Sequence, residues 1–220
     1  MIKRSQLEHA LRAAKEITGE NDFVVIGSGS ILGSFPIKGE TLTMATKEVD
    51  IYPRYKPEKS EMLNAIGVKS SFDVTHGFYV DPVSPTTATL PKGWEDRLVK
   101  VCNENTNGAV GWCLEPHDVA VAKLIAHRPK DIEFIEGLLK SGSADVSIIR
   151  KRLADTQVEH HQIRNMAEDY LDQILDDIMK AKNKEGTLTE LEKLMNRSGI
   201  HLPDDSPGNK SRDKGPEMER

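Results

Sequence analysis

The sequence predicts an α/β fold of the α+β type, in which a small mixed β-sheet is flanked by helices and followed by a helical C-terminal extension. Two observations support this prediction. Short apolar or alternating runs typical of strands occur at residues 23–26, 48–51, 77–83, 98–101 and 109–114, and segments with helical spacing separate several of them. After Gly142 only the helical pattern remains. A chain of 220 residues is long enough to bury a hydrophobic core.

A first helix is expected before the first strand. Ser5-Gln6-Leu7-Glu8 has the pattern of a capping box, which satisfies backbone N–H groups at the start of a helix. Apolar residues at helical spacing follow it up to Gly19: Leu7, Ala10, Leu11, Ala14 and Ile17. This helix should therefore bury one stripe of side chains against the sheet that begins at Phe23.

Two acids in the second strand-like run indicate chemistry rather than packing alone. Glu48 and Asp50 are separated by one residue, and strand residues two apart point to the same face of a sheet. Two carboxylates held so close repel each other, and their pKa values rise unless a cation compensates. Mg²⁺ prefers such oxygen ligands and keeps positions open for substrate phosphates. The pair therefore predicts a metal site.

The turn after the first strand complements the acid pair. It consists of small residues, and Gly27 and Ser28 offer backbone N–H groups that a phosphate can approach closely. Acids for a metal and a turn for phosphate together predict a nucleotide site. A dinucleotide-binding fingerprint is disfavoured, because the third glycine, Gly33, is out of place and no crossover helix fits before Thr46.

Two blocks of sequence resemble a known superfamily. Ile26-Gly27-Ser28 followed by Glu48-Val49-Asp50-Ile51 resembles the signature of the polymerase-β-type nucleotidyltransferases. Residues 113–139, CLEPHDVAVAKLIAHRPKDIEFIEGLL, resemble small bacterial proteins related to the abortive-infection toxin nucleotidyltransferases. The resemblance covers roughly residues 20–140.

The resemblance implies transfer of a nucleoside monophosphate from a nucleoside triphosphate, with Mg²⁺ or Mn²⁺ in a two-ion site. The acceptor would be an RNA, a protein or a small molecule, and the setting a toxin–antitoxin or phage-defence system. The spacing from Ser28 to Glu48 is longer than usual, and the first acid is Glu where Asp is commoner. These departures favour an alternative, a catalytically weak nucleotide-binding or interaction module with the same fold.

The resemblance also requires a third acid on a nearby strand. Asp81, the polar member of the apolar run at 77–83, is the candidate. It would bind a second metal ion and take the proton from the attacking hydroxyl. The alternative is that Asp81 caps a turn with Pro82 and Pro85, as Asp before Pro often does.

A helix is predicted after residue 117, with Asp118 as its N-cap and strong helix formers from Val119 to Ala126. Lys123 lies within it. A lysine in an apolar helix either extends its charged end to solvent or binds an anion. The resemblance favours binding to the nucleotide phosphates.

A further helix should begin at Pro129-Lys130-Asp131. The Arg-x-Lys-Asp string of Arg128, Lys130 and Asp131 resembles the second conserved block of the toxin-like relatives. From it the resemblance implies that Arg128 and Asp131 are nucleotide-binding residues. Asp131 also falls in the first helical turn, where a carboxylate complements the helix dipole, so a purely structural role is the alternative.

The predicted organisation has three parts. Residues 1–142 form the nucleotidyltransferase-like domain, 143–202 a helical region and 203–220 a disordered tail of polar residues. The helical region should contain an amphipathic helix at 163–178 and a short helix at 188–195, and it would serve a homodimer or a partner protein.

Composition limits the remaining possibilities. A net charge of −5 argues against a generally basic nucleic-acid-binding protein. Cys102 and Cys113 are too few for a disulfide scaffold or a four-ligand zinc site, so two reduced thiols are expected. No signal peptide is evident, and no apolar run approaches the roughly 18 residues of a membrane span. The sequence therefore predicts a cytoplasmic protein.

Overall fold

The computed structural model describes residues 2–34 and 46–197, with side chains described as far as residue 184. The chain divides into two compact units, residues 1–178 and 179–220, and the description below concerns the first. The three-part organisation with a boundary at residue 142 stays a prediction. The tail predicted to be disordered, 203–220, lies outside the described residues.

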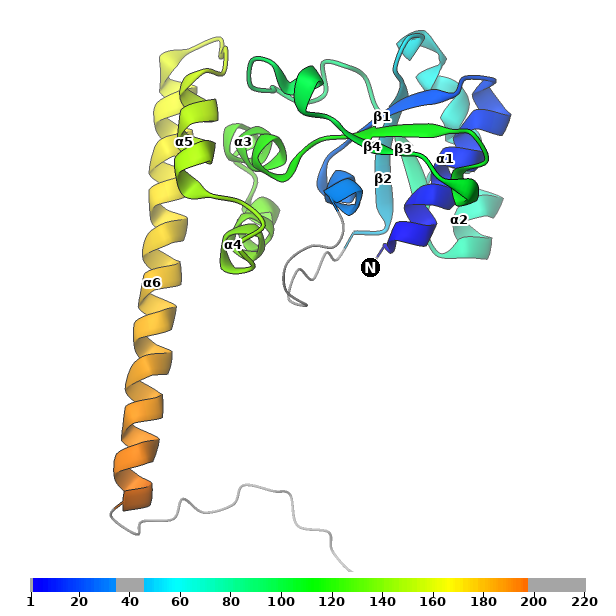
Figure 1. The fold of residues 1–220 in the computed structure, drawn as a ribbon. Helices are drawn as coiled ribbons and strands as arrows, with labels where there is room; N and C mark the ends of the chain where they lie inside the picture. The colour runs from blue at the N-terminus through cyan, green and yellow to red at the C-terminus, as the bar shows by residue number, and fades with distance from the viewer. Residues whose placement is uncertain (1, 35–45, 198–220) are drawn as a thin grey trace, which may run out of the picture. The chain divides into compact units, whose positions relative to one another are not determined.

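A five-stranded mixed sheet forms the centre of the first unit, in the order β3-β2-β1-β5-β4 (Figure 1). The pairs β1–β2 and β4–β5 are antiparallel, whereas β1–β5 and β2–β3 are parallel. The predicted α+β class and all five predicted strands are therefore confirmed. Their bounds are β1 Asp22–Ile26, β2 Glu48–Pro53, β3 Tyr79–Pro82, β4 Val99–Val101 and β5 Val110–Cys113.

Helix α1 (Arg4–Thr18) covers one face of the sheet (Figure 1). Its apolar stripe is fully buried from Leu7 to Ala14, and Ile17 at its end is partly buried. Leu11 packs so closely on β5 that a Cβ at Gly111 would lie 2.8 Å from it. The predicted capping box at Ser5 is wrong. Lys3 is the N-cap, and its backbone N–H donates to the Gln6 side chain at 2.8 Å. The chain thus enters the helix two residues earlier, with Gln6 in the role assigned to Glu8.

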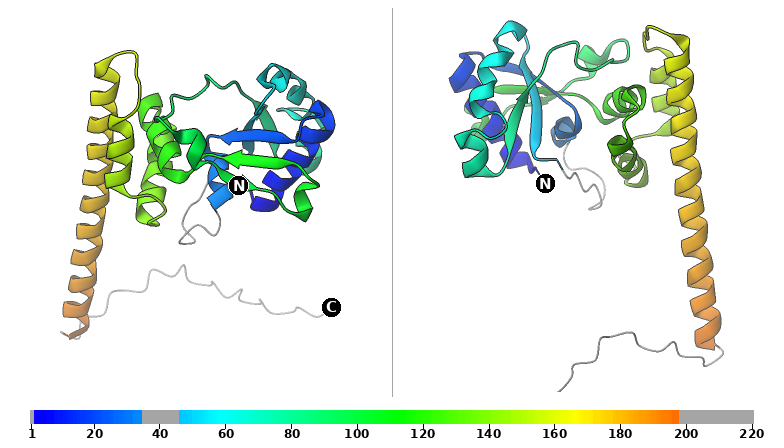
Figure 2. Two further views of the ribbon diagram at one scale, coloured as in Figure 1. Left: turned by 45° about the horizontal axis from the view of Figure 1, so that its top comes forward. Right: turned by 180° about the vertical axis from the view of Figure 1, so that it is seen from behind.

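The other α-helices follow the first strands in the chain, and most of them form one group next to the sheet. Figures 1 and 2 show α3, α4 and α5 gathered together next to the part of α6 that belongs to the same unit. The bounds are α2 Ser71–His76, α3 Pro116–Ala126, α4 Ile132–Lys140, α5 Val146–Ala154 and α6 His161–Arg197. The predicted short helix at 188–195 is wrong as a separate element, because α6 continues through it without a break.

Five short 3₁₀ helices complete the described elements. The longest of them, at residues 57–66, begins at Pro57. The bounds are η1 Ser28–Ser34, η2 Pro57–Ile66, η3 Trp94–Arg97, η4 Glu104–Thr106 and η5 Pro129–Asp131.

The start of α3 differs from the prediction. Glu115, not Asp118, is the N-cap, and Pro116 occupies the first helical position, which tolerates a missing N–H. Asp118 is fully buried and accepts two hydrogen bonds from Arg97, at 2.9 and 3.0 Å. Its carboxylate is therefore committed to an ion pair and cannot cap the helix.

None of the helices among the described residues combines the length and the apolar character that crossing a lipid bilayer requires.

Candidate functional site

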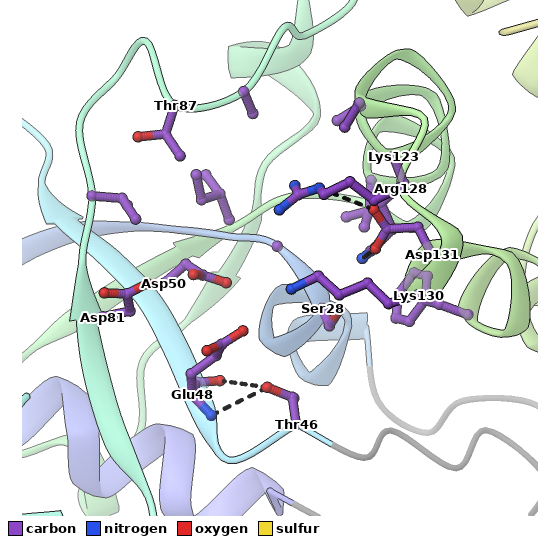
Figure 3. Close-up of a pocket in the computed structure, with 18 of the residues that line it drawn as sticks. Ser28, Thr46, Glu48, Asp50, Asp81, Thr87, Lys123, Arg128, Lys130 and Asp131 are labelled. Carbon is purple, nitrogen blue, oxygen red and sulfur yellow. Dashed lines mark hydrogen bonds and ion pairs between the residues drawn. The ribbon is translucent and has the colours of Figure 1, made fainter. Parts of the chain in front are cut away.

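A pocket of about 810 Å³ lies between the acid-bearing end of the sheet and the segment that joins α3 to α4 (Figure 3). Each residue that the sequence singled out as catalytic, nucleotide-binding or metal-binding lines it. These residues are Gly27, Ser28, Glu48, Asp50, Asp81, Lys123, Arg128 and Asp131. The fold thus brings together residues from the turn after β1, the start of η1, β2, β3, α3 and the segment of η5.

Strand pairing places the three acids on one face of the sheet. Asp50 on β2 is the direct partner of Asp81 on the parallel strand β3, and Glu48 is the partner of Tyr79. Side chains of paired residues point to the same face, so Glu48, Asp50 and Asp81 share it (Figure 3). Asp81 therefore stands in a strand beside the acid pair.

Gly27 lies directly against the acids. Asp50 is also the antiparallel partner of Ile26, so the turn after β1 begins beside its carboxylate. A Cβ on Gly27 would lie 2.0 Å from Asp50 Oδ2, and the backbone of Gly27 has the left-handed φ of +64°. Both facts require glycine here. The turn continues into η1, where the Ser30 hydroxyl donates to the Gly27 carbonyl at 2.8 Å.

The carboxylates carry uncompensated negative charge. Burial, with the charges of Glu48 and Asp81, raises the pKa of Asp50 to about 7. Burial and the charge of Glu48 also raise the pKa of Asp81. Glu48 accepts a hydrogen bond of 3.0 Å from the Tyr79 hydroxyl. An added cation would relieve this repulsion.

Cations and the carboxylates of Asp131 and Glu133 line the opposite wall. Lys123 is only 9% exposed; its ammonium forms an ion pair with Asp131 and lies 4.5 Å from the centroid of the Phe134 ring. Arg128 Nε lies 3.3 Å from the second oxygen of Asp131. Neither Lys123 nor Arg128 is therefore free of a carboxylate partner, and Asp131 holds both.

Lys130 is a pocket residue that was absent from the predicted site. It is exposed, and its side chain extends from the wall toward the acids (Figure 3). Its charge lowers the pKa of both Asp50 and Asp81, but burial and the neighbouring carboxylates raise these pKa values by more. Within the described residues its ammonium forms no hydrogen bond or ion pair. Its position between Arg128 and Asp131 in the sequence was the available signal.

Other lining residues were also missed. Tyr79 lies two residues before Asp81, so the strand alternation that paired Glu48 with Asp50 would have placed it on the same face. Thr87, in the connection after β3, and Phe134, in the first turn of α4, carry no comparable signal. Thr46 accepts the Glu48 backbone N–H at 3.1 Å and fixes the start of β2.

The acids of the pocket offer oxygen donors to a metal ion. Among the side chains that the structure describes, no three His, Cys, Asp or Glu residues form a group that would hold an ion as they stand. The chemistry of the acids nevertheless fits Mg²⁺, which is commonly bound through one or two carboxylates, with waters and substrate phosphates completing the shell. Adjacent carboxylates with raised pKa values supply such ligands.

Comparison with known proteins gives one match. The model of a protein family described as "Nucleotidyltransferase of unknown function (DUF6036)" matches residues 5–180, which includes every residue of the site described above. No curated protein and no solved structure matches the chain.

Proposed function

Because the chain belongs to the family of nucleotidyltransferases of unknown function, we propose that it transfers a nucleoside monophosphate from a nucleoside triphosphate to an acceptor, with Mg²⁺ or Mn²⁺ bound. One observation carries the proposal. Asp50 lies against the Gly27 turn and pairs in register with Asp81, and cationic side chains line the opposite wall of the same pocket. Negative charge for a metal and positive charge for phosphate thus face each other.

Glu48, Asp50 and Asp81 would hold the metal, in a two-ion arrangement if the third acid takes part. When bound, the ion supplies positive charge to the phosphoryl oxygens and lowers the pKa of the attacking hydroxyl. The two oxygens of each carboxylate are hard donors, as this ion requires.

The protein's own residues position the reactants. The backbone N–H groups at Gly27 and Ser28 face the triphosphate, while Lys123, Arg128 and Lys130 offset its charge. Asp81 accepts the proton of the acceptor hydroxyl, a role that suits a carboxylate of raised pKa. The acceptor oxygen then bonds to the α-phosphorus, the bond from that phosphorus to the bridging oxygen breaks, and pyrophosphate leaves.

The acceptor is an RNA, a protein or a small molecule bearing a hydroxyl or amino group. The segment at 113–139 supports a place among the toxin-like relatives, and with it a toxin–antitoxin or phage-defence setting. This placement rests on the resemblance of that segment alone.

The test uses the purified protein with each α-labelled nucleoside triphosphate, Mg²⁺ and a cell extract that contains RNA, protein and metabolites. Label should move to one class of acceptor with wild type and not with Asp50→Asn. Transfer that persists in Asp50→Asn would overturn the assignment of Asp50.

A second candidate is a catalytically weak nucleotide-binding or interaction module. Two observations favour it: no group of three metal-binding side chains is preformed among the described residues, and Lys123 is already paired with Asp131. Such a module would bind a nucleoside triphosphate in calorimetry, would transfer no label in any extract, and would bind it equally well after Asp81→Asn.

A further inference from the structure

The cationic wall of the pocket stands on a short segment, residues 127–131. His127 ends α3 in a left-handed conformation with φ 49°, which costs a non-glycine residue about 1 kcal/mol or more. The segment then carries Arg128, Lys130 and Asp131 into the pocket. A strained, partly exposed turn of this kind keeps one geometry only where other residues hold it.

Tyr170 of α6 contacts this segment without lining the pocket. Its ring lies 4.3 Å from the His127 ring, centroid to centroid, and its hydroxyl donates to the Arg128 carbonyl at 3.2 Å. The Asp131 backbone N–H donates to the same carbonyl at 2.9 Å. The Tyr170 side chain is buried, with 6% of the residue exposed. One tyrosine therefore contacts both residues at the start of the segment.

The opposite end of α3 is held in a similar way. Arg152 of α5 donates to Asp118 at 2.8 Å and also binds Glu115, the N-cap of α3. Arg97 completes the group by its two bonds to Asp118. Helix α3, which carries Lys123, is thus fixed by α5 at its start and by α6 at its end.

From these contacts we propose that Tyr170 is a positioning residue for the nucleotide: it fixes residues 127–131 so that Arg128 and Lys130 face the triphosphate, while Asp131 holds Lys123 and Arg128 in place. The inference rests on the proposed function, because it assigns a ligand to that site. It also gives residues 161–178 of α6 a role in the chemistry, although none of them lines the pocket.

Two substitutions separate the contacts of Tyr170. Tyr170→Phe keeps the ring against His127 and removes the hydrogen bond to Arg128, whereas Tyr170→Ala removes both. The Kd and KM for the nucleoside triphosphate should rise about tenfold in Tyr170→Ala and by an intermediate factor in Tyr170→Phe, with kcat changing less than KM.

Two control variants distinguish positioning by Tyr170 from a general loss of stability. Ile174→Ala removes a side chain of the same helix that is 1% exposed, and Tyr55→Phe removes a hydroxyl from a residue that is 70% exposed. Ile174→Ala should lower the melting temperature at least as far as Tyr170→Ala while leaving the Kd within twofold. The proposal would be overturned if nucleotide binding weakened equally in Ile174→Ala and Tyr170→Ala, or if it did not weaken in Tyr170→Ala.

A second readout needs no nucleotide. Hydrogen exchange at the backbone amides of His127 and Asp131, which donate to Lys123 and Arg128, should quicken in Tyr170→Ala and stay unchanged in Ile174→Ala. Unchanged exchange in Tyr170→Ala contradicts the positioning role directly. If wild type binds no nucleoside triphosphate, the proposed function fails, and the exchange data still decide whether Tyr170 holds the segment.

Discussion

The carboxylate of Asp50 occupies the space that a side chain at Gly27 would need. Asp50 Oδ2 lies 2.0 Å from the position of a Cβ on Gly27. The acid on β2 can therefore take this position only if the turn after β1 has a glycine there. The left-handed φ of Gly27 adds a second reason for glycine.

Gly27→Ala should therefore lose transfer activity by at least about tenfold, because the new methyl group displaces the Asp50 carboxylate. Stability should also fall, by about 1–2 kcal/mol from the left-handed φ and more from the clash. The measurements are label transfer and urea denaturation.

Gly19→Ala is the matched control, because Gly19 has φ +69° and an added Cβ would meet nothing within 4 Å. This variant should lose stability from backbone strain alone and keep its activity. If the two variants behave alike, the contact with Asp50 is unimportant.

Stability in the absence of divalent cations should fall as pH rises. The pKa of Asp50 is about 7 in the folded protein and 3.8 in its unperturbed state. Between these values the folded state binds more protons than the unfolded state, so the free energy of unfolding decreases with rising pH and levels off above about 7. Between pH 5 and pH 8 the ionisation of Asp50 should lower the free energy of unfolding by about 2–3 kcal/mol.

The measurement is denaturation of wild type and Asp50→Asn at several pH values with a chelator present. The difference in the free energy of unfolding between the two proteins isolates Asp50, because histidines that titrate in the same pH range contribute equally to both. A difference that does not change with pH would refute the raised pKa, and added Mg²⁺ should diminish the dependence.

Breaking the buried ion pair of Lys123 and Asp131 should be costly. The two side chains are 11% and 1% exposed, and removing one partner of such a pair typically costs about 3–5 kcal/mol. Asp131→Asn should therefore lower the free energy of unfolding by about 3 kcal/mol. Lys123→Met combined with Asp131→Asn should recover part of the loss.

Lys140→Ala provides the comparison, because its pair with Glu136 is exposed, with side chains 45% and 24% accessible. Such a pair contributes about 0.5 kcal/mol. An Asp131→Asn variant as stable as Lys140→Ala would mean that the pair at the pocket is solvated.

Lys130→Ala should raise the KM for the nucleoside triphosphate about tenfold and leave the melting temperature nearly unchanged, since the residue is exposed and its ammonium extends into the pocket. Lys100→Ala removes an exposed lysine that does not line the pocket, so its KM should match wild type. Equal KM values in the two variants would exclude Lys130 from phosphate binding.

Local patterns were sufficient to predict the strands and the grouping of Glu48 with Asp50, because strand alternation is a property of neighbouring residues. The position of Asp81 beside Asp50 depends on the register of two strands 31 residues apart, and only the resemblance suggested it. The contact of Tyr170 with Arg128 spans 42 residues and involves a backbone carbonyl, which leaves no mark in the sequence.

Capping shows a second limit. Ser5 and Asp118 have the right residue types for N-caps, yet Lys3 and Glu115 take these positions. At α3 the competing interaction is visible: Arg97 and Arg152 bind Asp118. A residue with good capping chemistry is thus used elsewhere when it is buried and arginines bind it, as Asp118 is.

The antiparallel pairing of Ile26 with Asp50 has a consequence for how related proteins are recognised. Backbone hydrogen bonds between β1 and β2 fix the distance from the Gly27 turn to the acids, whatever the number of residues that connect the two strands. Insertions and deletions between Ser34 and Thr46 are therefore compatible with the same active geometry. A search pattern that demands one fixed interval between the Gly-Ser turn and the first acid would overlook any relative that differs from this chain only in the length of that connection.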